Sequence, residues 1–151
     1  MLRKGSLLVL LIASLALSCL APQPAEMAAT DAHCWESGAQ VELFNADTLS
    51  LRRLSIAIRT NSRFSEDTLP LTIEVIAPDS TSFQEQYSLP TADIESSTIV
   101  AKSIAIPYRD RVCLSQRGNY RFIITPQTAI KGVEAVGVVV SEQTDTINGK
   151  R

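Results

Sequence analysis

The chain has 151 residues, with 14 basic and 16 acidic side chains, one His and three Cys, and this length allows one domain. Two of the basic residues, Arg3 and Lys4, lie in an N-terminal leader, so the rest of the chain carries 12 basic groups against 16 acidic ones. An acidic chain without a basic cluster is a poor nucleic-acid binder. One His without a Cys-x-x-Cys motif argues against most zinc sites, and a Gly-rich phosphate loop is absent from the sequence. We therefore expect no nucleic-acid partner, no metal and no cofactor.

The leader, residues 1–18, has the form of an export signal. Its apolar run, Leu7 to Leu17, has eleven residues and would span about 16 Å as a helix, roughly half a bilayer core. The end of the leader, Ala16-Leu17-Ser18-Cys19, resembles the bacterial lipoprotein processing box, in which the Cys is acylated. We therefore predict lipidation at Cys19 and a place in the cell envelope, most simply on the periplasmic side. The alternative is an ordinary signal peptide that leaves Cys19 as a passive thiol. Residues 19–32, with two Pro and few large apolar side chains, are expected to form a flexible tether.

From about residue 40 onward, apolar side chains alternate with period two, which predicts short antiparallel strands. The clearest strands are Leu54 to Ile58, Leu71 to Val75, Tyr120 to Ile124 and Val136 to Val140, and weaker ones are Val41 to Phe44, Ser82 to Leu89, Thr98 to Ile106 and Val112 to Leu114. About eight strands and no sustained helical stripe indicate an all-β, two-sheet antiparallel sandwich, jelly-roll or immunoglobulin-like, over residues 33–142. Val136 to Val140 is apolar on both faces, as a central strand would be. The tail, residues 143–151, is expected to be disordered.

Three segments together resemble the gliding-motility lipoprotein H family of Bacteroidetes. They are Ile56 to Phe64, with Arg59 before an Asn61 turn, then Gly118 to Ile124, and Gly132 to Val138. The leader and a Trp ahead of the first predicted strand also fit. One difference is that Asp93 to Ala105 contains neither the Trp nor the Gly expected in mid-chain, so the resemblance is to a divergent member. It implies a non-catalytic envelope lipoprotein linked to gliding motility and its secretion apparatus.

Cys34 and Cys113 remain if Cys19 is acylated, and two spare Cys in an exported chain suggest a disulfide. The alternative is two unpaired thiols. Trp35, Arg109 and Arg111 are candidates for a ligand or partner surface, although Trp35 is also suited to covering the end of the sandwich. His33 next to Cys34 could be imagined as a metal or nucleophile site, but neighbouring side chains on a strand point apart.

These residues favour a protein that is not an enzyme. The first hypothesis is an envelope lipoprotein that acts by protein–protein contact in the assembly or stability of motility or secretion machinery, with the membrane and envelope proteins as partners. The alternative is a β-sandwich lipoprotein that binds a glycan or another ligand.

Overall fold

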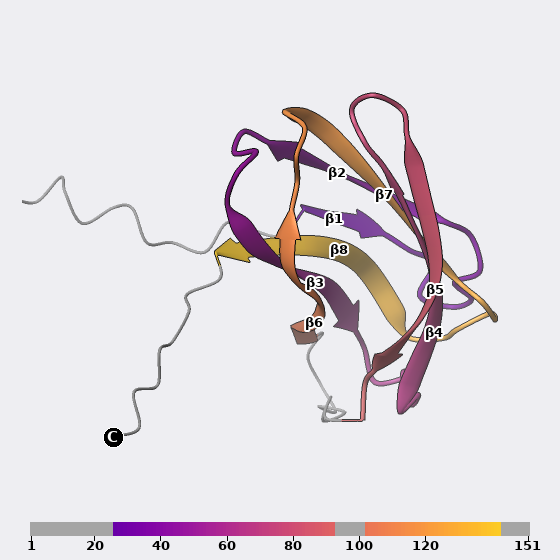
Figure 1. The fold of residues 1–151 in the computed structure, drawn as a ribbon. Helices are drawn as coiled ribbons and strands as arrows, with labels where there is room; N and C mark the ends of the chain where they lie inside the picture. Colours follow the sequence, from indigo (N-terminus) through magenta and orange to yellow (C-terminus); the bar gives the residue numbers. More distant parts are fainter. Residues whose placement is uncertain (1–25, 93–101, 143–151) are drawn as a thin grey trace, which may run out of the picture.

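The computed structural model of the chain describes residues 26–92 and 102–142. Within these ranges it is an all-β sandwich of eight strands in two four-stranded antiparallel sheets (Figure 1). The strands are β1 (Glu26–Ala29), β2 (Ala39–Asn45), β3 (Leu51–Thr60), β4 (Thr68–Ile76), β5 (Ser82–Pro90), β6 (Lys102–Cys113), β7 (Gly118–Pro126) and β8 (Val133–Glu142). The described part of the chain contains no helix long and apolar enough to cross a membrane.

The strand order is that of a jelly roll. One sheet runs β1-β8-β3-β6 and the other β2-β7-β4-β5. The chain therefore pairs its first strand with its last, its second with its seventh, its third with its sixth and its fourth with its fifth. Successive pairs alternate between the two sheets, as in a long hairpin wrapped around one core. This selects the jelly roll from the two sandwich types that the sequence left open.

The alternating stripes of the sequence fill the space between the sheets. Ile56 and Ile58 of β3, Leu71 and Ile73 of β4, and Phe122 and Ile124 of β7 are completely buried. β8 pairs with β1 on one side and β3 on the other, so it is a central strand, as its two apolar faces predicted.

The sandwich starts earlier than the sequence predicted. Glu26–Ala29, part of the expected tether, forms β1 and pairs with β8. Gly137 of β8 permits this pairing, because a Cβ at this position would lie 2.2 Å from the backbone oxygen of Glu26. Only a glycine lets β1 approach β8 so closely. The leader, Cys19 and the C-terminal tail lie outside the described residues.

Two other elements differ from the predicted ones. The described part of Thr98 to Ile106 and most of Val112 to Leu114 belong to one strand, β6. Register shifts in the β3–β6 ladder around Leu54 mark bulges in this strand. Arg111 has a left-handed backbone, with φ of 57°. These bulges break the period-two pattern that would have revealed a continuous strand.

Candidate functional site: a cleft between the sheet edges

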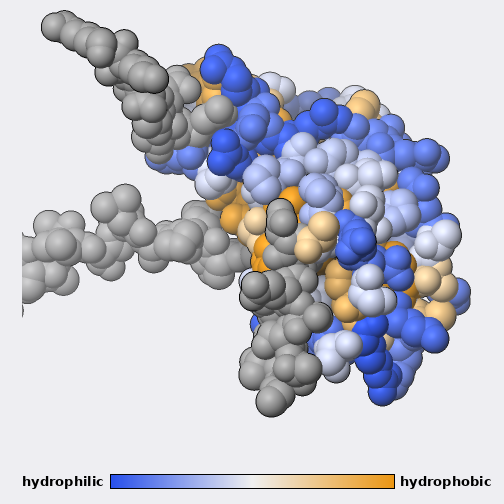
Figure 2. Space-filling view, turned by 90° about the horizontal axis from the view of Figure 1, so that it is seen from below, coloured by the Kyte–Doolittle hydropathy of each residue, from blue (hydrophilic) through white to orange (hydrophobic). Residues whose placement is uncertain are grey.

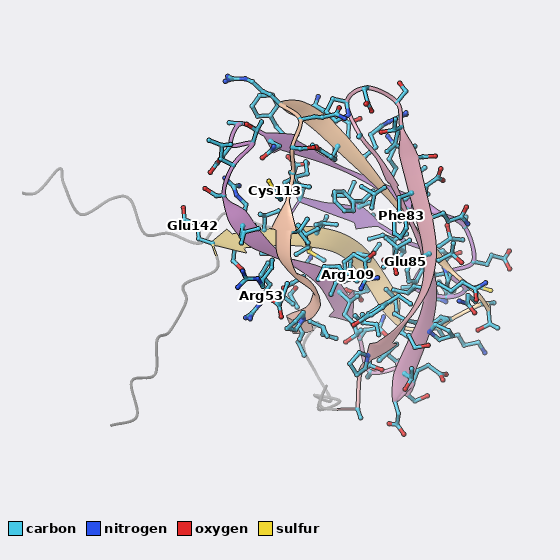
Figure 3. All side chains as sticks on the ribbon, viewed as in Figure 1. Arg53, Phe83, Glu85, Arg109, Cys113 and Glu142 are labelled. Atoms are coloured by element: carbon cyan, nitrogen blue, oxygen red, sulfur yellow. The ribbon has the colours of Figure 1, made fainter. Side chains whose placement is uncertain are left out.

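The two sheets leave a cleft of about 370 Å³ where the edge strands β5 and β6 face each other. Figure 3 shows Glu85 of β5 and Arg109 of β6 on either side of this gap. The floor is apolar and continuous with the core, and it is formed by Leu54, Val75, Val112, Leu114, Tyr120 and Phe122. Such a volume lies within the range of small-molecule and side-chain binding pockets.

The position of each cleft residue follows from the strand register. Phe83 and Glu85 of β5 are opposite Val75 and Ile73 of β4, so they share the inward phase of the sheet. Because β5 is an edge strand, its inward side chains face the cleft rather than the sealed core. Phe83 consequently stays 58% exposed although it points to the same side as buried Ile73.

The bulges of β6 bring polar groups to the mouth of the cleft. Tyr108 is 8% exposed and donates its hydroxyl hydrogen bond to Glu85, and the guanidinium of Arg109 forms an ion pair with the other oxygen of the same carboxylate. The guanidinium of Arg109 also lies over the Tyr108 ring, 5.3 Å from its centroid, in cation–π contact. The Glu85 side chain is 17% exposed, so this network is partly shielded from water.

Burial, followed by the neighbouring Glu85 carboxylate, raises the pKa of the Tyr108 hydroxyl above its ordinary value. Both causes disfavour a phenolate, the first by desolvation and the second because Glu85 accepts the hydroxyl hydrogen bond and would also repel a phenolate. Tyr108 therefore remains a hydrogen-bond donor at any physiological pH. At the mouth of the cleft, the Glu85 carboxylate is thus hydrogen-bonded to Tyr108 and ion-paired with Arg109.

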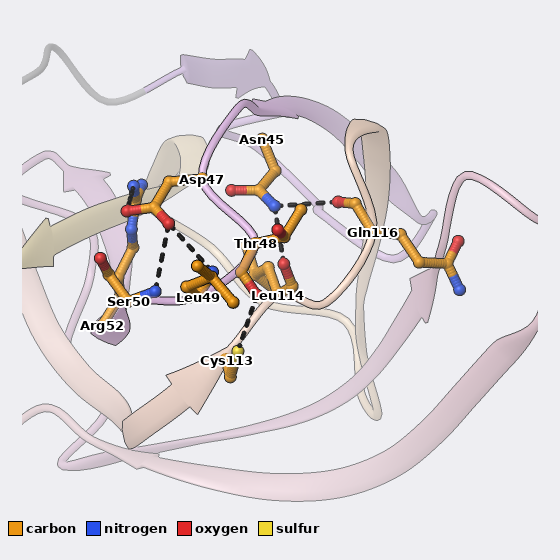
Figure 4. Close-up of polar contacts among 9 residues, drawn as sticks. All are labelled: Asn45, Asp47, Thr48, Leu49, Ser50, Arg52, Cys113, Leu114 and Gln116. Carbon is orange, nitrogen blue, oxygen red and sulfur yellow. Dashed lines mark hydrogen bonds and ion pairs between the residues drawn. The ribbon is translucent and has the colours of Figure 1, made fainter.

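The loop that follows β6, next to the cleft residue Leu114, is held by polar contacts (Figure 4). The buried Asn45 amide donates hydrogen bonds of 2.8 and 2.9 Å to the carbonyls of Leu114 and Gln116. The Gln116 side chain donates to Asp79 at 2.7 Å. Hydrogen bonds from Thr81, and then from Gln116, hold the pKa of Asp79 below its ordinary value. The loop after β6 is thus held in place by specific polar contacts.

The structure places only one of the three predicted surface residues in the cleft lining. Arg109 lies at the cleft, but Trp35 is only 1% exposed, and its indole N–H donates to the carbonyl of Ser37. Trp35 is therefore buried and does not belong to a surface, and its backbone bridges to Ile130. Arg111 is exposed on the bulged part of β6, outside the cleft lining.

The predicted disulfide is also wrong, because Cys34 and Cys113 are free thiols at opposite ends of the sandwich. Cys113 pairs with Leu51 at the start of β3. Cys34 precedes the Trp35–Ile130 bridge, close to where the chain leaves β3. Ten strand residues separate these ends, about 30 Å, whereas a disulfide needs Cα atoms within roughly 4.4–6.8 Å.

Sequence reasoning missed Glu85 and Phe83. A signal existed in β5, where Phe83, Glu85, Tyr87 and Leu89 occupy the inward phase. A carboxylate within an inward apolar stripe indicates an edge strand or a cleft, because a sealed core would desolvate it. No group of three or more His, Cys, Asp or Glu in residues 26–92 and 102–142 is arranged to hold a metal ion. His33 accepts a hydrogen bond from Arg63 at 2.6 Å on the exposed surface.

The comparisons with known proteins give limited information. No protein-family model matches the chain, and no curated protein matches it. Among solved structures it is similar to a carbohydrate-binding module specific for non-crystalline cellulose, with 14% sequence identity and a TM-score of 0.39. The match covers 74% of this chain and 73% of that one. A likeness at this level says nothing about what this chain binds, since unrelated functions share the sandwich architecture.

Proposed function

We propose that this chain is a non-catalytic binding protein of the cell envelope, and that it acts by taking part of another protein into the cleft between β5 and β6. The observation that carries this proposal is the apolar cleft itself, which leaves core-facing side chains open to solvent at one edge of the sandwich. Exposed apolar surface bordered by polar groups is typical of interaction sites. The ionisable groups at its mouth are paired with each other, which is a poor arrangement for acid–base catalysis.

The proposed envelope location rests on the leader. Acyl chains on Cys19 would contribute about 0.8 kcal/mol per buried methylene, so two or three chains anchor the protein firmly. β1, the described strand nearest to Cys19 in the chain, lies at one edge of its sheet, and β6 lies at the other edge (Figure 1). Replacement Cys19→Ala should release the protein from membranes, and an acyl-free protein that still sediments with membranes would contradict the anchor.

The resemblance to the gliding-motility lipoprotein H family supports a partner within motility or secretion machinery. In that setting the protein would stabilise or assemble the apparatus by contact. On the face seen from below, hydrophobic side chains lie in small areas among predominantly hydrophilic ones (Figure 2).

The second candidate is a ligand-binding lipoprotein, and the cleft volume favours it. An apolar or amphipathic small molecule suits the lining better than a glycan does. Sugars stack on flat aromatic faces, but the Tyr87 and Tyr108 rings are inclined at 78° to each other. Trp35, the other candidate for a sugar platform, is buried.

A photocrosslinking experiment tests the first candidate with a matched control. Phe83 and Phe44 are similarly exposed, at 58% and 60%, but only Phe83 lines the cleft. Each is replaced by a photoreactive phenylalanine in the native host, and cells are irradiated. We expect an envelope protein to be crosslinked through position 83 and not through position 44. The same crosslink should disappear when Val112→Phe fills the cleft.

Two outcomes would oppose this proposal. Equal crosslinking at both positions would mean that the cleft has no special role. Absence of a crosslinked protein, together with binding of an apolar fluorescent dye that Val112→Phe abolishes, would favour the small-ligand candidate. Thermal unfolding of the Val112→Phe variant checks that the substitution leaves the sandwich folded.

A further inference from the structure

Among residues 26–92 and 102–142, strand β5 is a long sheet edge beside the cleft. It has nine residues, and in these ranges it pairs only with β4, in the sheet order β2-β7-β4-β5. Nine residues give an edge about 30 Å long. Pro90, at its end, is compatible with an edge strand because it has no N–H to donate.

The pairing of β4 determines which backbone groups of β5 are free. The N–H of Gln127 donates to the carbonyl of Pro70 at 3.0 Å, so even-numbered residues of β4 direct their backbone groups toward β7. Odd-numbered residues therefore face β5, and their partners there are also odd-numbered. By the alternation of antiparallel ladders, Gln84 and Gln86 direct their N–H and C=O groups outward from the edge.

The other edges are protected in ways that β5 is not. β1 has only four residues, and β1 and β2 pack against each other across the two sheets. β6 is interrupted by bulges and carries Pro107. Bulges, prolines and short strands are the usual devices that prevent strand addition. In residues 26–92 and 102–142, β5 is a nine-residue edge without a bulge, and its one proline, Pro90, lies at its end.

Glu85 determines what kind of strand this edge can accept. A second copy of β5, paired antiparallel about the middle of the strand, would bring two Glu85 carboxylates to the same face close to the twofold axis. The two carboxylates would be diagonal neighbours on one face, and inward-pointing charges are a known device against self-pairing. Glu85 accepts one hydrogen bond each from Tyr108 and Arg109, whereas a carboxylate has about four acceptor sites. It therefore complements a cationic or hydroxyl side chain on an incoming strand.

We infer that the occupant of the cleft is an extended segment of another protein that pairs with β5 as a fifth strand of its sheet. Its inward side chains are apolar and enter the cleft, except for a Lys, Arg, Ser or Thr that faces Glu85. Backbone hydrogen bonds to Gln84 and Gln86 supply affinity, and the cleft supplies the preference for alternating apolar residues. This inference rests on the proposed function and specifies the class of its partner.

The test uses a dye-labelled ten-residue peptide with blocked ends, Thr-Val-Thr-Val-Thr-Lys-Thr-Val-Thr-Val. The protein is the folded chain without its leader, and Cys19→Ala is its only substitution. One control peptide has the same composition with its Val residues contiguous. The other control peptide has Glu in place of Lys. We expect fluorescence anisotropy to show that the alternating peptide binds at least about tenfold more tightly than either control, a difference of about 1.4 kcal/mol. Equal binding of the three peptides would overturn the inference.

Two further measurements locate the binding. Gln86→Pro removes one outward N–H without removing a bond to β4, and should weaken binding about tenfold or more, whereas the matched Gln86→Thr should leave it unchanged. In the protein without a substitution at position 86, hydrogen exchange of the Gln84 and Gln86 backbone amides should slow when the peptide is saturating. Unchanged exchange at both amides would overturn strand pairing even if Gln86→Pro fails to fold.

The outcomes separate this inference from the proposed function. A crosslink through position 83 that is lost in Val112→Phe, combined with no preference among the peptides, would keep the cleft as the partner site and refute the strand. A stable dimer by light scattering that Gln86→Pro dissociates would show that a second copy occupies the edge, and would also refute the inference.

Discussion

Gly137→Ala should detach β1 from the sandwich, because this glycine is where β1 and β8 come closest. A Cβ at position 137 would lie 2.2 Å from the Glu26 carbonyl oxygen and 2.8 Å from the Met27 side chain. The first of these atoms is backbone, so it cannot rotate away. The strand as a whole has to move, and β1 contains only four residues, none fully buried.

The expected cost can be bounded from the structure. Inserting a methyl group into packed structure typically costs about 1–3 kcal/mol, and release of a short, half-exposed strand keeps the cost within this range. For a domain of this size, that corresponds to a fall in melting temperature of about 3–12 °C. A released β1 would also lengthen the tether by about 13 Å, at about 3.3 Å for each of its four residues.

Two assays with one control variant test this reasoning. Thermal unfolding measures the stability, and a Glu-specific protease measures whether the backbone at Glu26 becomes accessible. Gly38→Ala is the matched control, because a Cβ there meets only side-chain atoms, at 2.9 Å from Thr125 and 3.0 Å from Ile123. It should change stability by less than about 0.5 kcal/mol. A Gly137→Ala protein with an unchanged melting temperature and a protected Glu26 would refute the pairing of β1 with β8.

Three other predictions concern the cleft and the thiols. Asn45→Ala removes both hydrogen bonds to the loop after β6 and should cost about 1–3 kcal/mol in chemical denaturation; a smaller loss would mean that the loop is held without it. Because the pKa of Tyr108 is raised in the folded state, its contribution to the stability of the fold is complete below the ordinary pKa of 10.0 and is lost as pH rises above that value. Absorbance titration of the folded protein should show a tyrosine ionisation above pH 10 that Tyr108→Phe removes, and a titration in which Tyr108→Phe removes only ionisation at or below pH 10 would contradict this. Alkylation of the folded protein without reductant should modify both Cys34 and Cys113, as seen by mass, and protection of the pair would contradict their separation.

The fold class was predictable because strand periodicity is a local property. Phe122 and Ile124 show the same alternation in the sequence that buries them in the sandwich. The two apolar faces of Val136 to Val140 likewise predicted a central strand, which β8 is. In each case, neighbouring residues carry the whole signal, since consecutive side chains of a strand point to opposite faces.

The candidate site was hardly predictable, since it depends on which strands become edges. Glu85 and Arg109 are 24 residues apart in the chain and meet only because β5 and β6 end their respective sheets on the same side. The bulges that turn Tyr108 toward Glu85 also conceal β6 as a single strand. For Cys34 and Cys113 the sequence suggested a contact that the structure does not make. Two spare Cys suggested a disulfide, but the two residues lie at opposite ends of β3, about 30 Å apart. The sequence thus determined most of the strands and their inward faces. The tertiary pairing decided where the core is left open, because a local mark such as the Glu85 carboxylate does not tell which strand lies across the cleft from it.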